Sequence, residues 1–180
     1  EYKGMTSVNQ TDVPVPKTYD LCEDLNVVGT PFFLMDHVDG NIFWDLTLAK
    51  CSSEERSKIY WSMNDTIAKL HNADFKSIGL SDYGKYENYM ARQITRWSKQ
   101  YKDSETTLIP EMDNLIQWLP ENIPSGEETS IVHGDFRLDN MVFDKNSNDV
   151  IAILDWELST LCYPIADFTY HMMSWRMPLA

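Results

Sequence analysis

The eight residues HGDFRLDN, at 133–140, place histidine, aspartate, arginine and asparagine side chains between two apolar segments. The pair Ile131-Val132 leads into this stretch, and a second apolar segment begins at Met141. A solvated turn can contain the same charges, but apolar strands on both sides would fix this one against the core of a domain. The stretch therefore favours a fold that keeps a polar site beside its core, where protons and metal ions can be handled.

The segment that follows predicts where a metal ion would bind. Residues 141–143 and 150–154 are apolar, and the turn-forming sequence NSND between them indicates a β-hairpin. Adjacent antiparallel strands place the start of one beside the end of the next. Asn140, before the first strand, and Asp155, after the second, are therefore expected to be neighbours. A carboxylate beside an amide oxygen suits a hard cation such as Mg²⁺, which leaves Asp135 free to accept a proton.

The remaining pattern predicts an α+β domain. Apolar runs at 19–22 and 31–35, separated by turn-forming residues, indicate a pair of strands. From Ser52 the apolar spacing changes to that of a helix, and Glu55 three residues later completes a capping box. Further helices are predicted from the spacing of Tyr86, Met90, Ile94, Trp97 and Tyr101, between Pro110 and Pro120, and from Pro164 through Trp175. The apolar faces of these helices are expected to pack against other helices in the core.

The composition excludes several classes of partner. A formal charge of −13 opposes binding to nucleic acids and to anionic membranes, which are polyanions. The charge does not exclude small phosphate ligands, because divalent cations held by carboxylates can screen the negative charge of the phosphates. No apolar run approaches the ~20 residues of a membrane span. Three cysteines without a CxxC spacing indicate reduced thiols and an intracellular protein.

The spacing of Asp135, Asn140 and Asp155 is that of the protein-kinase catalytic loop, which places a base five residues before a metal-binding asparagine. The chain departs from protein kinases because HGD replaces HRD, DWE replaces DFG, and no APE segment follows. The stretches IVHGDFRLDNMVFD and VIAILDWELSTLCYPIADFTYH instead resemble the aminoglycoside-phosphotransferase-like family of small-molecule kinases. Within that family, VVGTPFFLMDHVDG and RWSKQY are most similar to the kinase-like domain at the N-terminus of fusion acyl-CoA dehydrogenases. The resemblance runs along essentially the whole chain.

This resemblance implies a protein-kinase-like fold. Residues 1–40 would be a remnant of the N-lobe, with the end of a helix and the hinge strands, and residues 41–180 a mostly helical C-lobe that contains the catalytic-loop hairpin. Residues 1–30 contain no glycine-rich loop followed by a strand lysine, the parts that position the triphosphate in kinases. We therefore expect those parts to lie outside the chain and the C-lobe to be truncated. The 180-residue piece alone is expected to have little or no kinase activity.

The resemblance also implies roles for the loop residues. Asp135 would be the catalytic base that orients and deprotonates a substrate hydroxyl, and His133 would support the loop. Arg137 would contact the γ-phosphate; the alternative is an outward arginine that pairs with a carboxylate such as Asp139. Asp167 would brace the loop through hydrogen bonds from the helix behind it.

The cofactors that the resemblance implies are ATP and Mg²⁺. Asn140 and Asp155 would hold the metal ion. Glu1 would be the N-lobe glutamate that pairs with the ATP-binding lysine, or else an ordinary exposed side chain. Backbone groups of the interlobe hinge would bind adenine at Met35, Asp36, His37 and Val38.

The implied reaction transfers the γ-phosphate of ATP to a hydroxyl of a small molecule. The acyl-CoA dehydrogenase resemblance points to a 4-hydroxyacyl-CoA or related hydroxy acid as acceptor, to a dehydrogenase domain later in the same chain, and to a mitochondrial or peroxisomal location. Sugars, aminoglycosides and choline-like alcohols stay open. The charge of −13 would favour cationic alcohols if the acceptor pocket were acidic.

Two other functions could use the same residues. A metal-dependent phosphoesterase would need further histidines to hold two metal ions, and only His37, His71 and His171 lie outside the loop. A non-catalytic, kinase-like binding module would have no need of the base and the metal ligands, which are all present.

Overall fold

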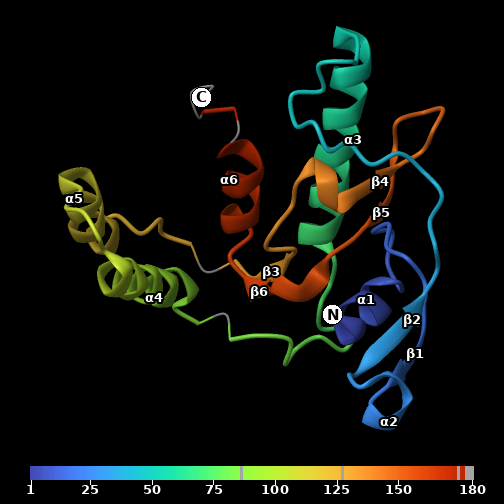
Figure 1. The fold of residues 1–180 in the computed structure, drawn as a ribbon, viewed down its shortest axis with the longest axis horizontal. Helices are drawn as coiled ribbons and strands as arrows, with labels where there is room; N and C mark the ends of the chain where they lie inside the picture. The colour runs from blue at the N-terminus through green and yellow to red at the C-terminus, as the bar shows by residue number, and fades with distance from the viewer. Residues whose placement is uncertain (86, 127, 174, 177–180) are drawn as a thin grey trace.

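The computed structural model describes residues 1–85, 87–126, 128–173 and 175–176 (Figure 1). Its first elements are α1 (Tyr2–Val8), β1 (Thr18–Cys22), a single helical turn α2 (Leu25–Val28) and β2 (Phe32–Met35). β1 and β2 pair antiparallel, which confirms the predicted strand pair. The sequence indicated a loop where α2 forms. The turn is helical because the Asp24 carboxylate caps its first residues and Gly29 ends it in the left-handed conformation.

Helix α3 (Ser53–Asn72) is the longest of the described helices (Figure 1). Its N-terminus has the predicted capping box. The Ser52 hydroxyl accepts from the Glu55 N–H at 3.2 Å, and the Glu55 carboxylate accepts from the Ser52 N–H at 2.7 Å. The buried face of α3 contributes Ile59, Met63, Ile67 and Leu70 to the hydrophobic core. The helix therefore provides the surface on which the following strands pack.

Two small antiparallel sheets pack against α3 and flank the polar stretch of the sequence. β3 (Ser130–Val132) pairs with β6 (Thr160–Cys162), and β4 (Met141–Phe143) pairs with β5 (Val150–Ile153). The β4–β5 hairpin and the α+β class are confirmed. β6 was not predicted, because three residues are too few for a periodic pattern.

Helices α4 (Tyr89–Ser104) and α5 (Pro110–Trp118) extend away from this core (Figure 1). The prediction that their apolar faces pack in the core is wrong for the residues that the structure describes. Neither helix has a buried residue there, and Trp97 and Trp118 are 55% and 56% exposed. Helical spacing determines which side chains share a face, but not whether another element covers that face. Tyr86 lies outside the described residues.

Helix α6 (Ile165–Met173) follows Pro164 as predicted; its predicted end at Trp175 stays a prediction, because Ser174 lies outside the described residues. It contributes two buried polar side chains, Asp167 and His171, to the interior. Within the described ranges, no helix is both long and apolar enough to cross a membrane.

Candidate active site

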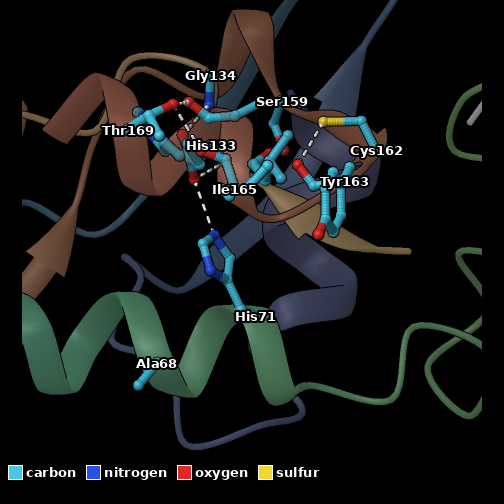
Figure 2. Close-up of polar contacts among 12 residues, drawn as sticks. Ala68, His71, His133, Gly134, Ser159, Cys162, Tyr163, Ile165 and Thr169 are labelled. Carbon is cyan, nitrogen blue, oxygen red and sulfur yellow. Dashed lines mark hydrogen bonds and ion pairs between the residues drawn. The ribbon is translucent and has the colours of Figure 1, made fainter. Parts of the chain in front are cut away.

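One buried carboxylate holds the 133–140 loop from behind. Asp167 accepts hydrogen bonds from the N–H of His133 at 2.8 Å and the N–H of Gly134 at 3.0 Å, and it lies 3.2 Å from Nε2 of His71 (Figure 2). Burial alone would raise the pKa of Asp167, but the hydrogen bonds from His71 and from the two N–H groups outweigh burial and hold the pKa below its usual value. The carboxylate is therefore charged at neutral pH and joins α3, α6 and the loop.

The buried ring of His133 fixes the loop a second time. Its Nε2 lies 2.8 Å from the carbonyl oxygen of Leu154, and its Nδ1 accepts from the N–H of Asp135 at 3.3 Å. Burial lowers the pKa of His133, so the ring is neutral at pH 7. A proton on Nε2 satisfies both contacts, because that nitrogen then donates to Leu154 while Nδ1 accepts. This geometry fits the supporting role that was expected of His133.

Gly134 makes the turn between His133 and Asp135. Its φ is +88°, and a Cβ at this position would lie 2.7 Å from the carbonyl oxygen of Leu158. A side chain would therefore be strained by the backbone angle and would also collide with the neighbouring segment. This explains why the loop reads HGD where protein kinases have HRD.

The carboxylate of Asp135 is held at both oxygens. Nδ2 of Asn140 donates to Oδ2 at 2.9 Å, and also to the backbone oxygen of Asp135 at 2.9 Å. The Tyr170 hydroxyl donates to Oδ1 at 2.7 Å, and Nε of Arg137 lies 3.7 Å from Oδ2. The side chain of Asp135 is still 23% exposed, so a small molecule can reach it.

Asn140 and Asp155 lie side by side, as the hairpin predicted. The N–H of Leu154 donates to the carbonyl of Asn140 at 2.8 Å, and Asp155 is the next residue. Because the Asn140 amide nitrogen donates to Asp135, its Oδ1 is the atom that a metal ion would use, and this role stays a prediction. Asp155 is exposed and has a left-handed backbone conformation. The next residue, Trp156, is anchored by a hydrogen bond from its Nε1–H to the Ile153 carbonyl at 2.9 Å. An amide oxygen and a carboxylate on neighbouring residues are ligand types that would suit Mg²⁺, so the metal-binding role of Asn140 and Asp155 stays a prediction.

The structure shows Arg137 in the alternative arrangement. Its Nη2 donates to Asp139 at 2.6 Å, and its side chain is 44% exposed. The same guanidinium lies 3.7 Å from the Asp135 carboxylate. The expected contact between Arg137 and the γ-phosphate of a bound nucleotide stays a prediction.

The predicted hinge follows β2 and is largely exposed, as is Glu1 at the start of α1. The N–H of Asp36 donates to Lys17 at 2.8 Å, so this donor is already used within the β1–β2 pair. Further along, Asn41 exchanges two 2.8 Å backbone hydrogen bonds with Phe143 of β4. The linker after the hinge is thereby fixed to the same hairpin that positions Asn140. The adenine contacts of Met35, Asp36, His37 and Val38, and the role of Glu1, stay predictions.

A cavity of about 220 Å³, which no sequence pattern indicated, adjoins the loop. It is lined by residues that directly follow Asp135, by Tyr170 and His171 of α6, and by Leu46, Tyr60 and Met63. A second cavity of about 800 Å³ shares Leu46, Tyr60 and His171 and adds Arg56 and Trp175. Burial lowers the pKa of His171. The described lining of both cavities is mostly apolar and contains no carboxylate.

Tyr170 is the site residue that the sequence interpretation missed. A signal was available, because Tyr170 lies three residues after Asp167 and residues at that spacing share a helix face. Only the fold shows that this face of α6 meets Asp135.

Comparisons with known proteins identify the family of the chain. A family model described as "Phosphotransferase enzyme family" matches residues 1–180. Acyl-CoA dehydrogenase family member 10 of Mus musculus is 43% identical over 178 residues, which are 99% of this chain and 17% of that protein. The chain therefore spans less than a fifth of that relative's length, and 23% of acyl-CoA dehydrogenase family member 11 of Homo sapiens.

Two solved structures also match. One, from Ralstonia eutropha JMP134 and provisionally described as an aminoglycoside phosphotransferase, is 52% identical with a TM-score of 0.95, covering 99% of this chain and 55% of its own. A thermostable mutant of aminoglycoside phosphotransferase APH(4)-Ia, in complex with ADP and hygromycin B, is 16% identical with a TM-score of 0.68, covering 97% of this chain and 61% of its own. The second likeness shows the fold alone.

Asp167→Asn tests the anchoring carboxylate. The substitution removes the charge and one of the oxygen acceptors that face the two N–H groups, so the free energy of unfolding at pH 7 should fall by about 2–4 kcal/mol. Because the folded pKa of Asp167 is depressed, its contribution is complete above the ordinary aspartate pKa and is lost as pH falls through the folded value. The difference in unfolding free energy between the unsubstituted protein and Asp167→Asn should therefore become smaller below pH ~4.

Urea unfolding from pH 7 to pH 3 measures this difference. Asp149→Asn, on the exposed turn of the β4–β5 hairpin, is the matched control and should leave stability nearly unchanged. A difference that stays constant over the whole pH range would show that the Asp167 charge does not stabilise the fold.

Proposed function

Since the chain belongs to the phosphotransferase enzyme family, we propose that it is the kinase-like part of a longer protein and transfers the γ-phosphate of ATP to a hydroxyl of a small molecule. The observation that carries this proposal is the placement of Asp135. Its Oδ2 contacts Asn140 of the metal-binding pair, and its Oδ1 contacts Tyr170 in the wall of the cavity. The base thus lies where a metal-bound phosphate and an acceptor hydroxyl could meet.

The donor in this proposal is ATP bound with Mg²⁺. The complex of APH(4)-Ia with ADP supports a nucleotide donor. When bound, ATP supplies the transferable phosphoryl group, and Mg²⁺ supplies the positive charge that screens the phosphates. Asn140 and Asp155 would hold the metal ion through oxygen atoms, and exposed backbone groups between Met35 and Val38 would hold adenine.

The remaining chemistry belongs to the loop. Asp135 would accept the proton of the acceptor hydroxyl, a step that contributes about 10²–10⁴-fold in general-base catalysis. Asp167 and His133 would keep the loop backbone in place while the carboxylate acts. Positioning of this kind supplies much of the catalysis in phosphoryl transfer.

The cavity supports an apolar acceptor. Leu46, Met63, Phe136 and Leu138 contribute apolar walls. The nearby charged lining side chains are arginines, Arg137 and Arg56. Such walls would favour an aliphatic chain that ends in an anionic group over a polycationic aminoglycoside or a choline-like alcohol. We therefore propose a 4-hydroxyacyl-CoA or related hydroxy acid as the acceptor, which the name of the acyl-CoA dehydrogenase relative also supports.

The same relative supports a fused acyl-CoA dehydrogenase domain in the longer protein. The two other functions receive less support from the geometry. His71 bonds Asp167, His133 is buried in the loop, His171 lines the cavities and His37 is exposed near the hinge, so the histidines of the described chain do not gather as a two-metal phosphoesterase requires. A binding module alone gives no reason for an oriented base beside a metal-binding pair.

Asp135→Asn tests the assigned base. In the full-length protein, turnover with MgATP and 4-hydroxyoctanoyl-CoA should fall at least about 100-fold, because an amide cannot accept the hydroxyl proton. ATP binding, measured by calorimetry, should change little. Asp149→Asn again serves as the control, since this carboxylate is exposed on the hairpin turn. Undiminished turnover in Asp135→Asn would remove the base from its assigned role.

Leu46→Asp tests the acceptor class. A carboxylate in the shared wall of the two cavities should lower kcat/KM for 4-hydroxyoctanoyl-CoA about 10-fold or more, because it repels an anionic acceptor and makes the wall polar. Leu46→Met keeps the wall apolar and should change kcat/KM by less than about 3-fold. Choline and hygromycin B complete the panel and should be poor acceptors of the unsubstituted protein. A preference for either cationic acceptor would contradict the apolar pocket.

A further inference from the structure

Tyr170 makes the shortest hydrogen bond to the proposed base. Its hydroxyl donates to Oδ1 of Asp135 at 2.7 Å, while Asn140 occupies Oδ2 at 2.9 Å. A carboxylate attached at one oxygen can still rotate about its Cβ–Cγ bond. Two donors on different oxygens, one from the loop and one from α6, fix the plane of the carboxylate.

The position of Tyr170 in the fold suits this task. Asp167, one helical turn earlier on α6, holds the backbone of the same loop at His133 and Gly134. One rigid helix therefore fixes both the loop backbone and the carboxylate of its base. Tyr170 also lines the small cavity, so the residue that holds Oδ1 of Asp135 is itself part of the cavity wall.

The state of the Tyr170 hydroxyl is compatible with a permanent donor. The hydrogen bond to Asp135, together with burial and the negative charge of that carboxylate, raises the pKa of Tyr170 above its usual value. The phenol therefore keeps its proton at neutral pH. The nearby Arg137 lowers the pKa of Tyr170, but this effect is smaller than the upward shift.

We propose that Tyr170 is a positioning residue for the phosphotransfer reaction: its hydroxyl orients the Asp135 carboxylate toward an acceptor hydroxyl in the adjoining cavity. The inference rests on the proposed function, because Asp135 must be the base for its orientation to matter. Tyr170 acts through Asp135 and makes no direct contribution to the transfer. Removal of its hydroxyl should therefore lower kcat and leave acceptor binding almost unchanged.

Tyr170→Phe in the full-length protein tests this inference, with MgATP and 4-hydroxyoctanoyl-CoA as the probes. The variant keeps the ring in the cavity wall and removes only the hydroxyl. We expect kcat to fall about 10-fold, with KM for the acceptor, KM for ATP and the unfolding midpoint changed little. Tyr101→Phe on α4 is the matched control, since the Tyr101 hydroxyl is buried without a hydrogen-bond partner among the described residues. Its kcat should equal that of the unsubstituted protein.

A double-mutant cycle separates orientation of the base from an independent effect. If Tyr170 acts through Asp135, then Tyr170→Phe should cause no further loss in an Asp135→Asn background. NMR of ¹³Cζ-labelled tyrosine provides a readout without turnover. The Tyr170 resonance should titrate above the usual tyrosine range, and Asp135→Asn should move that titration to lower pH, whereas Asp149→Asn should not.

The possible outcomes are distinct. Unchanged kcat in Tyr170→Phe, additive losses in the double variant, or a Tyr170 resonance insensitive to Asp135→Asn would each overturn the inference and leave the proposed function standing. A loss that appears in KM or in the unfolding midpoint, with kcat intact, would assign Tyr170 to pocket shape or stability and would also overturn it. Absence of MgATP-dependent transfer in the unsubstituted protein, with every acceptor of the panel, would overturn the proposed function and this inference together.

Discussion

The charged carboxylate of Asp167 is the interaction on which the arrangement of the site depends. It lies in the interior, where an ionised group is costly unless hydrogen bonds compensate for lost water. His71 and the N–H groups of His133 and Gly134 provide that compensation. These partners are 33 to 96 residues away in the sequence, so satisfying one buried charge brings together the end of α3, the start of α6 and the polar loop.

Once the loop backbone is fixed, its side chains face two different environments. On one side, Asn140 and Asp155 form a pair of oxygen donors at the start and end of the β4–β5 hairpin. On the other side, a mostly apolar cavity lies beside Tyr170. Asp135 contacts both sides through its two oxygens. A carboxylate between a polar edge and an apolar pocket suits the proposed transfer of a phosphoryl group from a nucleotide to an apolar alcohol.

Features set by neighbouring residues were predictable from the sequence. The capping box joins Ser52 and Glu55, which are only three positions apart, and the Asn140–Asp155 adjacency follows from a hairpin with a short turn. Longer-range features were not. The face of α4 that carries Ile94 and Trp97 has the spacing of a buried face, but neither side chain is buried, and nothing local says whether another element covers that face. The Tyr170–Asp135 bond joins residues 35 positions apart, and only the packing of α6 shows it.

Residue types and short spacings alone indicated an aspartate and an asparagine five residues apart in a polar loop, and a second carboxylate after the hairpin. These features depend on residue types and short spacings, which can be read directly from the sequence. Only the packing of distant segments sets the orientation of these side chains and the lining of the adjoining cavity. Burial of Asp167 sets the loop, Tyr170 sets the carboxylate, and the walls contributed by α3 and α6 make the pocket apolar despite a net charge of −13. Net charge sums over the whole surface, whereas a pocket is defined by the few side chains that packing brings together.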